Sequence, residues 1–190
     1  MTRVFRHDIL PLIKERWSPR AYSEEKISKD DLYAILEAAS YAPSCFNEQP
    51  WRFILADDEK SLSKMRSILY SGNLQWAQKA PVLLLIAAKK TFTLNNEENF
   101  WHMFDTGTAW GFLSLEAQKR GIITHAMGGF SMSKARKFFK IPEDYEIVTV
   151  VAIGRYGDIN QLNDDLKQRE HPDTRKDISE LFLDKLDKGE

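Results

Sequence analysis

The sequence is poor in cysteine and has no long apolar run, and each of these absences excludes a class of protein. It holds 190 residues and one cysteine, Cys45, so no disulfide can form within the chain. We therefore expect a reducing, cytoplasmic setting. The longest apolar run, residues 82–88, is far short of the roughly 20 residues that span a bilayer, and the first ten residues show no secretory pattern. These features predict neither a membrane span nor a signal peptide.

The sequence also has no excess of positive or negative residues, since its formal net charge is -1. No basic field is available to attract nucleic acid or an anionic membrane, so any anion site must be a local cluster. Neither GxGxxG nor GxxxxGK[ST] occurs, which argues against a dinucleotide-binding Rossmann site and a P-loop. The four histidines lack zinc-ligand spacing, and we expect no metal site.

The composition fits one globular domain over residues 1–190, with 43% hydrophobic and 12% aromatic residues. Ser28 is a candidate N-cap, and Gly121 is a candidate left-handed C′ residue after a long helix. Residues 161–175 suggest an irregular excursion. The periodicity predicts strands over 51–56, 81–88, 121–127 and 145–154, and helices over 28–41, 59–70, 98–120, 131–140 and 178–188.

These elements interleave helices with strands that are apolar throughout. Residues 82–88 are wholly apolar, which is typical of a strand covered on both faces. The sequence therefore predicts a mixed α/β or α+β class.

One cluster of candidate ligand-binding residues is Arg16-Trp17-Ser18-Pro19-Arg20. Pro19 biases Ser18 towards extended geometry, and positions two apart in an extended chain point to one side. Two guanidinium groups and a hydroxyl on one side suit a phosphate. A solvated basic segment with surface ion pairs is the alternative interpretation.

A second candidate is the loop YAPSCFNEQPW, residues 41–51. Pro43 and Pro50 stiffen it, leaving Ser44, Asn47 and Gln49 as hydrogen-bonding groups that could contact a planar heterocycle. An ordinary helix–strand connection, with polar side chains capping turns, explains the same residues.

Cys45 lies in this loop, which raises the hypothesis of a thiol enzyme. A nucleophilic cysteine needs a base within hydrogen-bond reach. No sequence feature places His7, His102, His125 or His171 beside it, and no dithiol motif exists.

Two further stretches offer weaker signals. Gly128 and Gly129 follow a predicted strand, where glycines allow a ligand to approach the backbone closely or simply form a turn. Near the C-terminus, Arg175 and Lys176 could join the two arginines of the first cluster around one anion, or belong to a solvated charged run before a helix.

Taken together, these stretches resemble the nitroreductase family of FMN-dependent oxidoreductases. The resemblance is carried, in chain order, by R16-W-S-P-R20, A42-P-S-C-F-N-E-Q-P-W51, G128-G129 and R155-Y-G-D158. It implies an α+β fold with a sheet flanked by helices. It also implies an intertwined homodimer that holds FMN at the subunit interface.

The resemblance further implies which residues bind FMN. The family positions that hold the phosphate and the polar ring atoms match Arg16, Ser18 and Arg20, and Trp17 between them contributes backbone contact. Arg175 and Lys176 match the basic C-terminal residues that complete the phosphate site.

Other positions implied by the resemblance lie around the flavin ring. Asn73 matches an amide at the edge of the isoalloxazine, and the backbone of Gly128 and Gly129 faces flavin N5. The loop that reaches FMN from the partner subunit is matched by Pro43, Ser44, Cys45 and Asn47.

The implied activity is a ping-pong reaction. NADH or NADPH gives hydride to flavin N5, and a nitroaromatic, quinone or similar small electron-poor acceptor then takes the electrons. The flavin performs the chemistry, so no side-chain acid or nucleophile is expected. A flavin-binding carrier or redox-responsive module without turnover is the alternative.

Overall fold

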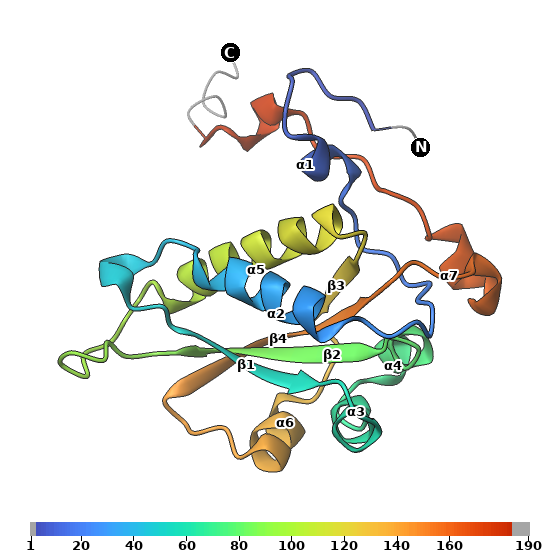
Figure 1. The fold of residues 1–190 in the computed structure, drawn as a ribbon. Helices are drawn as coiled ribbons and strands as arrows, with labels where there is room; N and C mark the ends of the chain where they lie inside the picture. Colours follow the sequence, from blue (N-terminus) through green and yellow to red (C-terminus); the bar gives the residue numbers. More distant parts are fainter. Residues whose placement is uncertain (1–2, 184–190) are drawn as a thin grey trace.

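The computed structural model describes residues 3–183 and contains one four-stranded antiparallel sheet (Figure 1). The strand order is β1-β2-β4-β3. The strands are β1 (Trp51–Ala56), β2 (Val82–Lys89), β3 (Ile123–Met127) and β4 (Tyr145–Gly154). The four predicted strands are confirmed, and with helices on both faces the fold is α+β.

Helices cover both faces of this sheet (Figure 1). Helices α2 (Lys29–Ser40) and α5 (His102–Lys119) pack on one face. Helices α3 (Glu59–Arg66), α4 (Ser71–Ala77) and α6 (Met132–Phe139) pack on the other. The remaining short elements are α1 (Pro11–Glu15), η1 (Cys45–Asn47), η2 (Ile159–Gln161), α7 (Asp164–Gln168) and η3 (Ile178–Leu181).

The side chains of strand β2 explain why the sheet has a layer of helices on each face. Leu83 and Leu85 belong to the core beneath α3, α4 and α6, whereas Leu84 and Ile86 belong to the core beneath α2 and α5. All four are at most 1% exposed. Because successive side chains of a strand point to opposite faces, an uninterrupted apolar run requires helices on both sides.

The predicted helix ends are confirmed at two places. Ser28 caps α2, with its hydroxyl accepting a 3.0 Å hydrogen bond from the backbone N–H of Asp31. Gly121 follows α5 with φ +66°, the left-handed conformation that a residue without Cβ adopts readily. Helix α5 begins at His102 rather than near residue 98, because buried Asn99 forms the preceding turn with its carbonyl oxygen bonded to His102.

Other predicted boundaries were wrong. Helix α3 ends at Arg66, and a separate helix, α4, follows. The stretch interpreted as an irregular excursion contains α7, and helix α1 was not anticipated. These helices have five to seven residues, too few to establish a 3.6-residue period.

The final helix predicted over residues 178–188 is also wrong over its described part. Only η3 forms there, started by a reciprocal capping interaction between Asp177 and Glu180. Ile178 and Leu181 are more than half exposed, so no core supports a longer helix. Residues 184–188 of this prediction lie outside the described residues.

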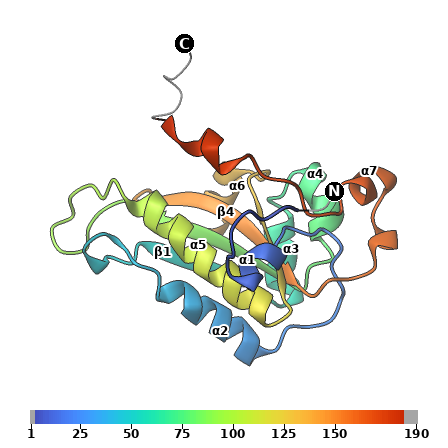
Figure 2. The ribbon, with the colours of Figure 1, turned by 90° about the horizontal axis from the view of Figure 1, so that it is seen from above.

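The two terminal segments, residues 3–10 and 173–183, run along the side of the molecule that carries α5 (Figures 1 and 2). The Arg3 side chain connects them, donating from Nε to the carbonyl oxygen of Asp173 at 3.1 Å. Among residues 3–183, no helix is both long and apolar enough to cross a bilayer.

Candidate functional site

The Arg16–Arg20 segment lines a cavity of about 120 Å³. Arg16 has extended backbone geometry, and its Nη2 donates to Ser18 Oγ at 3.2 Å, so both side chains lie together as the spacing predicted. The volume is a few times the roughly 30 Å³ that a water molecule occupies in the liquid, which suits a phosphate-sized anion. The lining residues are Arg3, Arg16, Trp17, Ser18, Arg20, His125, Arg169, His171, Asp173 and Arg175.

Positive charge dominates this arginine-lined cavity. Burial lowers the pKa of Arg16, and the neighbouring charges of Arg3 and Arg175 lower it further. Burial likewise lowers the pKa of Arg20, followed by the charge of Arg169. Arg16 Nη1 is buried without a hydrogen-bond partner among the described residues. A bound anion would relieve both the charge repulsion and this unsatisfied donor.

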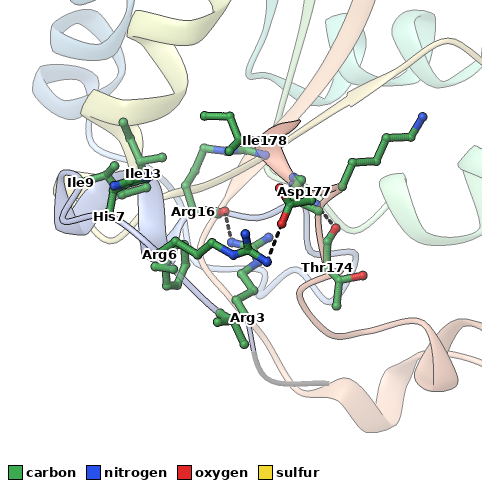
Figure 3. A pocket seen from close by; sticks show the side chains of 13 residues that line it. Arg3, Arg6, His7, Ile9, Ile13, Arg16, Thr174, Asp177 and Ile178 are labelled. Carbon is green, nitrogen blue, oxygen red and sulfur yellow. Dashed lines mark hydrogen bonds and ion pairs between the residues drawn. The ribbon is translucent and has the colours of Figure 1, made fainter. Parts of the chain in front are cut away.

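A larger cavity of about 760 Å³ lies next to it, between the terminal segments (Figure 3). It shares Arg3, Arg16 and Arg175 with the smaller one, and Arg3 Nη1 donates to the carbonyl oxygen of Arg16 at 2.8 Å. Lys176 lines only the larger cavity. Of the two C-terminal basic residues, the structure therefore brings Arg175 to the arginine-lined cavity but not Lys176.

His125, on strand β3, also lines the arginine-lined cavity, although nothing in its sequence context marked it. Its Nδ1 lies 2.9 Å from the carbonyl oxygen of Pro19, so Nδ1 carries the proton. Burial lowers the pKa of His125 to about 4, and the charges of Arg20 and Arg16 add to this. The neutral ring stacks, tilted, on Trp76 at a centroid distance of 4.5 Å.

Helix α4 connects this region to the glycine pair. Asn73, one turn before Trp76, donates from Nδ2 to the carbonyl oxygen of Gly129 at 3.1 Å. A Cβ atom on Gly129 would lie 2.6 Å from Asn73 Nδ2, whereas Gly128 has open space around it. Asn73 is thus in direct contact with Gly129, and Gly128 lies next to this contact in the chain.

Glu170 was not anticipated either. Its carboxylate is fully buried, and Oε1 accepts hydrogen bonds of 2.8 Å from the backbone N–H groups of both Arg20 and Ala21. Oε2 lies 3.8 Å from Arg20 Nη1. Pairing across 150 residues leaves no local pattern in the sequence.

The loop from Pro43 to Asn47 lies elsewhere. Figures 1 and 2 place η1 at the end of the molecule opposite α4 and α7. Ser44 Oγ accepts from the backbone N–H of Gln49 at 3.0 Å, and the backbone N–H of Cys45 donates to Asp105 Oδ2 at 3.0 Å. A single chain therefore does not unite this loop with the arginines.

The turn is wound unusually tightly. Phe46, Asn47 and Gln49 all have positive φ, between 50° and 56°, a region that non-glycine residues seldom adopt. The Phe46 side chain is 90% exposed and meets Phe92 edge-on. The buried carboxylate of Asp105, on α5, helps to hold the turn in this shape.

The four-stranded antiparallel sheet between helices defines an α+β protein, and a small cavity at one end of it is lined by several arginines. Comparison with known families is more specific. The nitroreductase family model matches residues 13–75 and 68–155. The chain belongs to the nitroreductase family, and the expectation drawn from its motifs is confirmed.

Individual relatives agree. A protein of Archaeoglobus fulgidus named "Putative NADH dehydrogenase/NAD(P)H nitroreductase" is 32% identical over 151 residues, covering 77% of this chain and 84% of the relative. A crystal structure described as an oxidoreductase containing FMN superposes with a TM-score of 0.91 at 34% identity, covering 95% of this chain and 93% of that one. An FMN-dependent nitroreductase of Clostridium difficile shares the fold, with a TM-score of 0.67 at 24% identity, over 93% and 95% of the two chains.

Proposed function

We propose that this protein is an FMN-dependent oxidoreductase that takes hydride from NADH or NADPH and reduces a small electron-poor acceptor, such as a nitroaromatic or a quinone. The observation that carries the proposal is the arginine-lined cavity in a nitroreductase-family chain, where Arg16 Nη1 has no hydrogen-bond partner among residues 3–183. The similar oxidoreductase structure that contains FMN supports the choice of cofactor.

The donor set fits the phosphate of FMN. Arginines bind phosphate oxygens through paired N–H groups, and Ser18 adds a hydroxyl. Arg16, Ser18, Arg20 and Arg175 would hold the phosphate, and the backbone around Trp17 borders the same cavity. Lys176, which lines the neighbouring cavity, would contribute only a longer-range positive potential.

The flavin ring would extend towards Asn73, Gly128 and Gly129. The backbone at Gly128 is exposed and has no neighbour within 4 Å of a Cβ position, so a planar ring can approach it closely. When bound, FMN supplies the redox chemistry by accepting a hydride from the nicotinamide and passing electrons to the acceptor. The protein's part is to bind, orient and exclude water, which requires no side-chain nucleophile.

A second copy of the chain would complete the site. The α5 side exposes large apolar residues of the kind that subunit interfaces cover, namely Phe100, Trp101, Met103, Phe104 and Phe112. The loop with Pro43, Ser44, Cys45 and Asn47 is distant from its own chain's arginines. In an intertwined homodimer this loop would reach the flavin bound by the partner.

The visible spectrum of the purified protein tests this proposal. Protein incubated with FMN and desalted should keep the flavin absorption bands. Anaerobic addition of NADH or NADPH should then bleach them, and a nitroaromatic or quinone should restore them. A protein that remains colourless after FMN loading would contradict the flavin site itself.

Retained flavin that neither nucleotide bleaches would support instead a flavin carrier without turnover. Comparing the bleaching rates with NADH and with NADPH also determines the preferred reductant, which no motif in the sequence specifies.

A further inference from the structure

Two side chains from elsewhere in the fold, the buried Glu170 and the partly buried His125, hydrogen-bond to the backbone of the Arg16–Arg20 segment and of Ala21 next to it. Glu170 accepts hydrogen bonds from the N–H groups of Arg20 and Ala21, and His125 donates one to the carbonyl oxygen of Pro19. Three consecutive residues are thus fixed by side chains that do not belong to the segment. The arginine side chains point from this backbone into the cavity.

Glu170 is unusual among these contacts because a buried carboxylate is costly unless it is paired. Its side chain has 0% exposure, while the nearest guanidinium nitrogen of Arg20 is 3.8 Å from Oε2. That separation is longer than a charged hydrogen bond. The two short bonds, both 2.8 Å, go instead to backbone N–H groups.

The segment that carries Glu170 is anchored in the hydrophobic core. Leu166, on α7, is 6% exposed and belongs to the core beneath α3, α4 and α6, as does Leu162. The backbone N–H of Glu170 bonds to the carbonyl oxygen of Lys167 at 3.1 Å, closing the turn after α7. The carboxylate is therefore presented from a rigid support.

We propose that Glu170 is a positioning residue for the anion site. What matters is the length of its side chain rather than its charge. The carboxylate sets the position of the Arg20 backbone, and thereby the angle at which the arginines meet a phosphate. This inference rests on the proposed flavin function for the identity of the ligand, but not for the existence of the anion site. Displacements of about 1 Å in such a site can cost up to about a hundredfold in function.

Two substitutions separate reach from charge. Glu170→Asp keeps the charge but shortens the side chain by about 1.5 Å, so it cannot hold both N–H groups at 2.8 Å. Glu170→Gln loses the charge but keeps an oxygen acceptor in the same place. Glu24→Asp is the matched control, because Glu24 is 79% exposed and pairs only with Lys79 at 3.1 Å among its described contacts.

FMN affinity, measured by quenching of flavin fluorescence, is the readout, with circular dichroism and thermal melting to establish that each variant is folded. We expect Glu170→Asp to raise the dissociation constant about tenfold or more, and Glu170→Gln and Glu24→Asp to stay within about threefold. Wild-type affinity in folded Glu170→Asp would overturn the proposal. So would a tenfold loss in Glu170→Gln, which alone decides the matter if Glu170→Asp does not fold.

A parallel titration with inorganic pyrophosphate by calorimetry distinguishes the two proposals. If the wild type binds pyrophosphate but not FMN, the flavin function fails and the same ranking of variants is expected for pyrophosphate. If the wild type binds neither, the anion site does not exist, and the proposed role of Glu170 is refuted as well.

Discussion

The side-chain amide of Asn73 donates to the carbonyl oxygen of Gly129, and it would have to move if Gly129 carried a Cβ. A Cβ on Gly129 would stand 2.6 Å from Asn73 Nδ2, closer than such contacts allow. The two residues lie 56 positions apart in the sequence. Their contact fixes α4 against the end of β3.

We predict that Gly129→Ala destabilises the FMN-free protein by about 1–3 kcal/mol, because Asn73 must move and its hydrogen bond weakens. Gly128→Ala is the matched control, since a Cβ there would have no atom within 4 Å and the expected change is below about 0.5 kcal/mol. Urea denaturation measures both. Equal effects of the two substitutions would mean that the close approach of Asn73 is unimportant.

The arginine-lined cavity predicts a salt-dependent defect. Arg20→Ala should weaken FMN binding by about 1.5–3 kcal/mol, the range for a hydrogen bond to a charged group. The loss should be larger near 0.01 M salt than near 1 M, where the Debye lengths are about 30 Å and about 3 Å. Lys137→Ala, at an exposed position on α6, is the control and should leave affinity unchanged at both salt concentrations.

His125 predicts a pH dependence of stability. Its pKa is about 4 in the folded protein and about 6.5 in an unfolded chain, so the unfolded state binds the extra proton between these values. Stability from the neutral ring is complete above about pH 6.5 and is lost as the pH falls towards 4, amounting to about 3 kcal/mol. Denaturant titrations at pH 7 and about pH 4.5 should therefore show a larger drop for the wild type than for His125→Gln. Parallel curves for the two proteins would refute this.

The thiol of Cys45 should be dispensable. The backbone N–H of Cys45, not the sulfur, makes the described contact with Asp105, and a serine preserves it. Cys45→Ser should change the rate of acceptor reduction by less than about twofold. Asp105→Ala removes the acceptor and should lower both stability and the rate. Loss of activity in Cys45→Ser would revive the thiol-enzyme hypothesis.

Phe104 tests the proposed homodimer. Its side chain is 72% exposed on α5, so an aspartate there should disturb the monomer little while placing a charge in a subunit interface. Phe104→Asp should shift the protein towards monomer in light scattering and lose FMN in parallel. Met132→Asp, 51% exposed at the start of α6, is the control and should leave the oligomeric state unchanged.

The sequence predicted best what is determined locally. Residues 82–88 are apolar at every position, so a strand covered on both faces is the simplest solution, and β2 has that burial. The Arg16–Ser18 spacing likewise predicts side chains on one side, and the two do form a hydrogen bond. The family motifs, although each is short, supported the correct family because their order extends over most of the chain.

The site residues that the sequence did not reveal are those whose contacts form only in the tertiary structure. Glu170 contacts residues about 150 positions away, and His125 contacts one 106 positions away. Neither has a neighbouring residue pattern that indicates the contact. The predicted final helix fails for the converse reason: Ile178 and Leu181 recur at helical spacing, but they remain 52% and 65% exposed, so little buried apolar surface stabilises a longer helix.

The hydrogen bond from Arg3 to Asp173 joins residues 170 positions apart, at the edge of the cavity that both residues line. A ribosome delivers the beginning of a chain long before its end. The sheet, whose last strand ends at Gly154, can therefore form on a nascent chain before residues 173–175 emerge and close the pocket for the ligand. Cofactor loading would then be a late event in the life of each molecule, and apoprotein would be the species that quality control first meets.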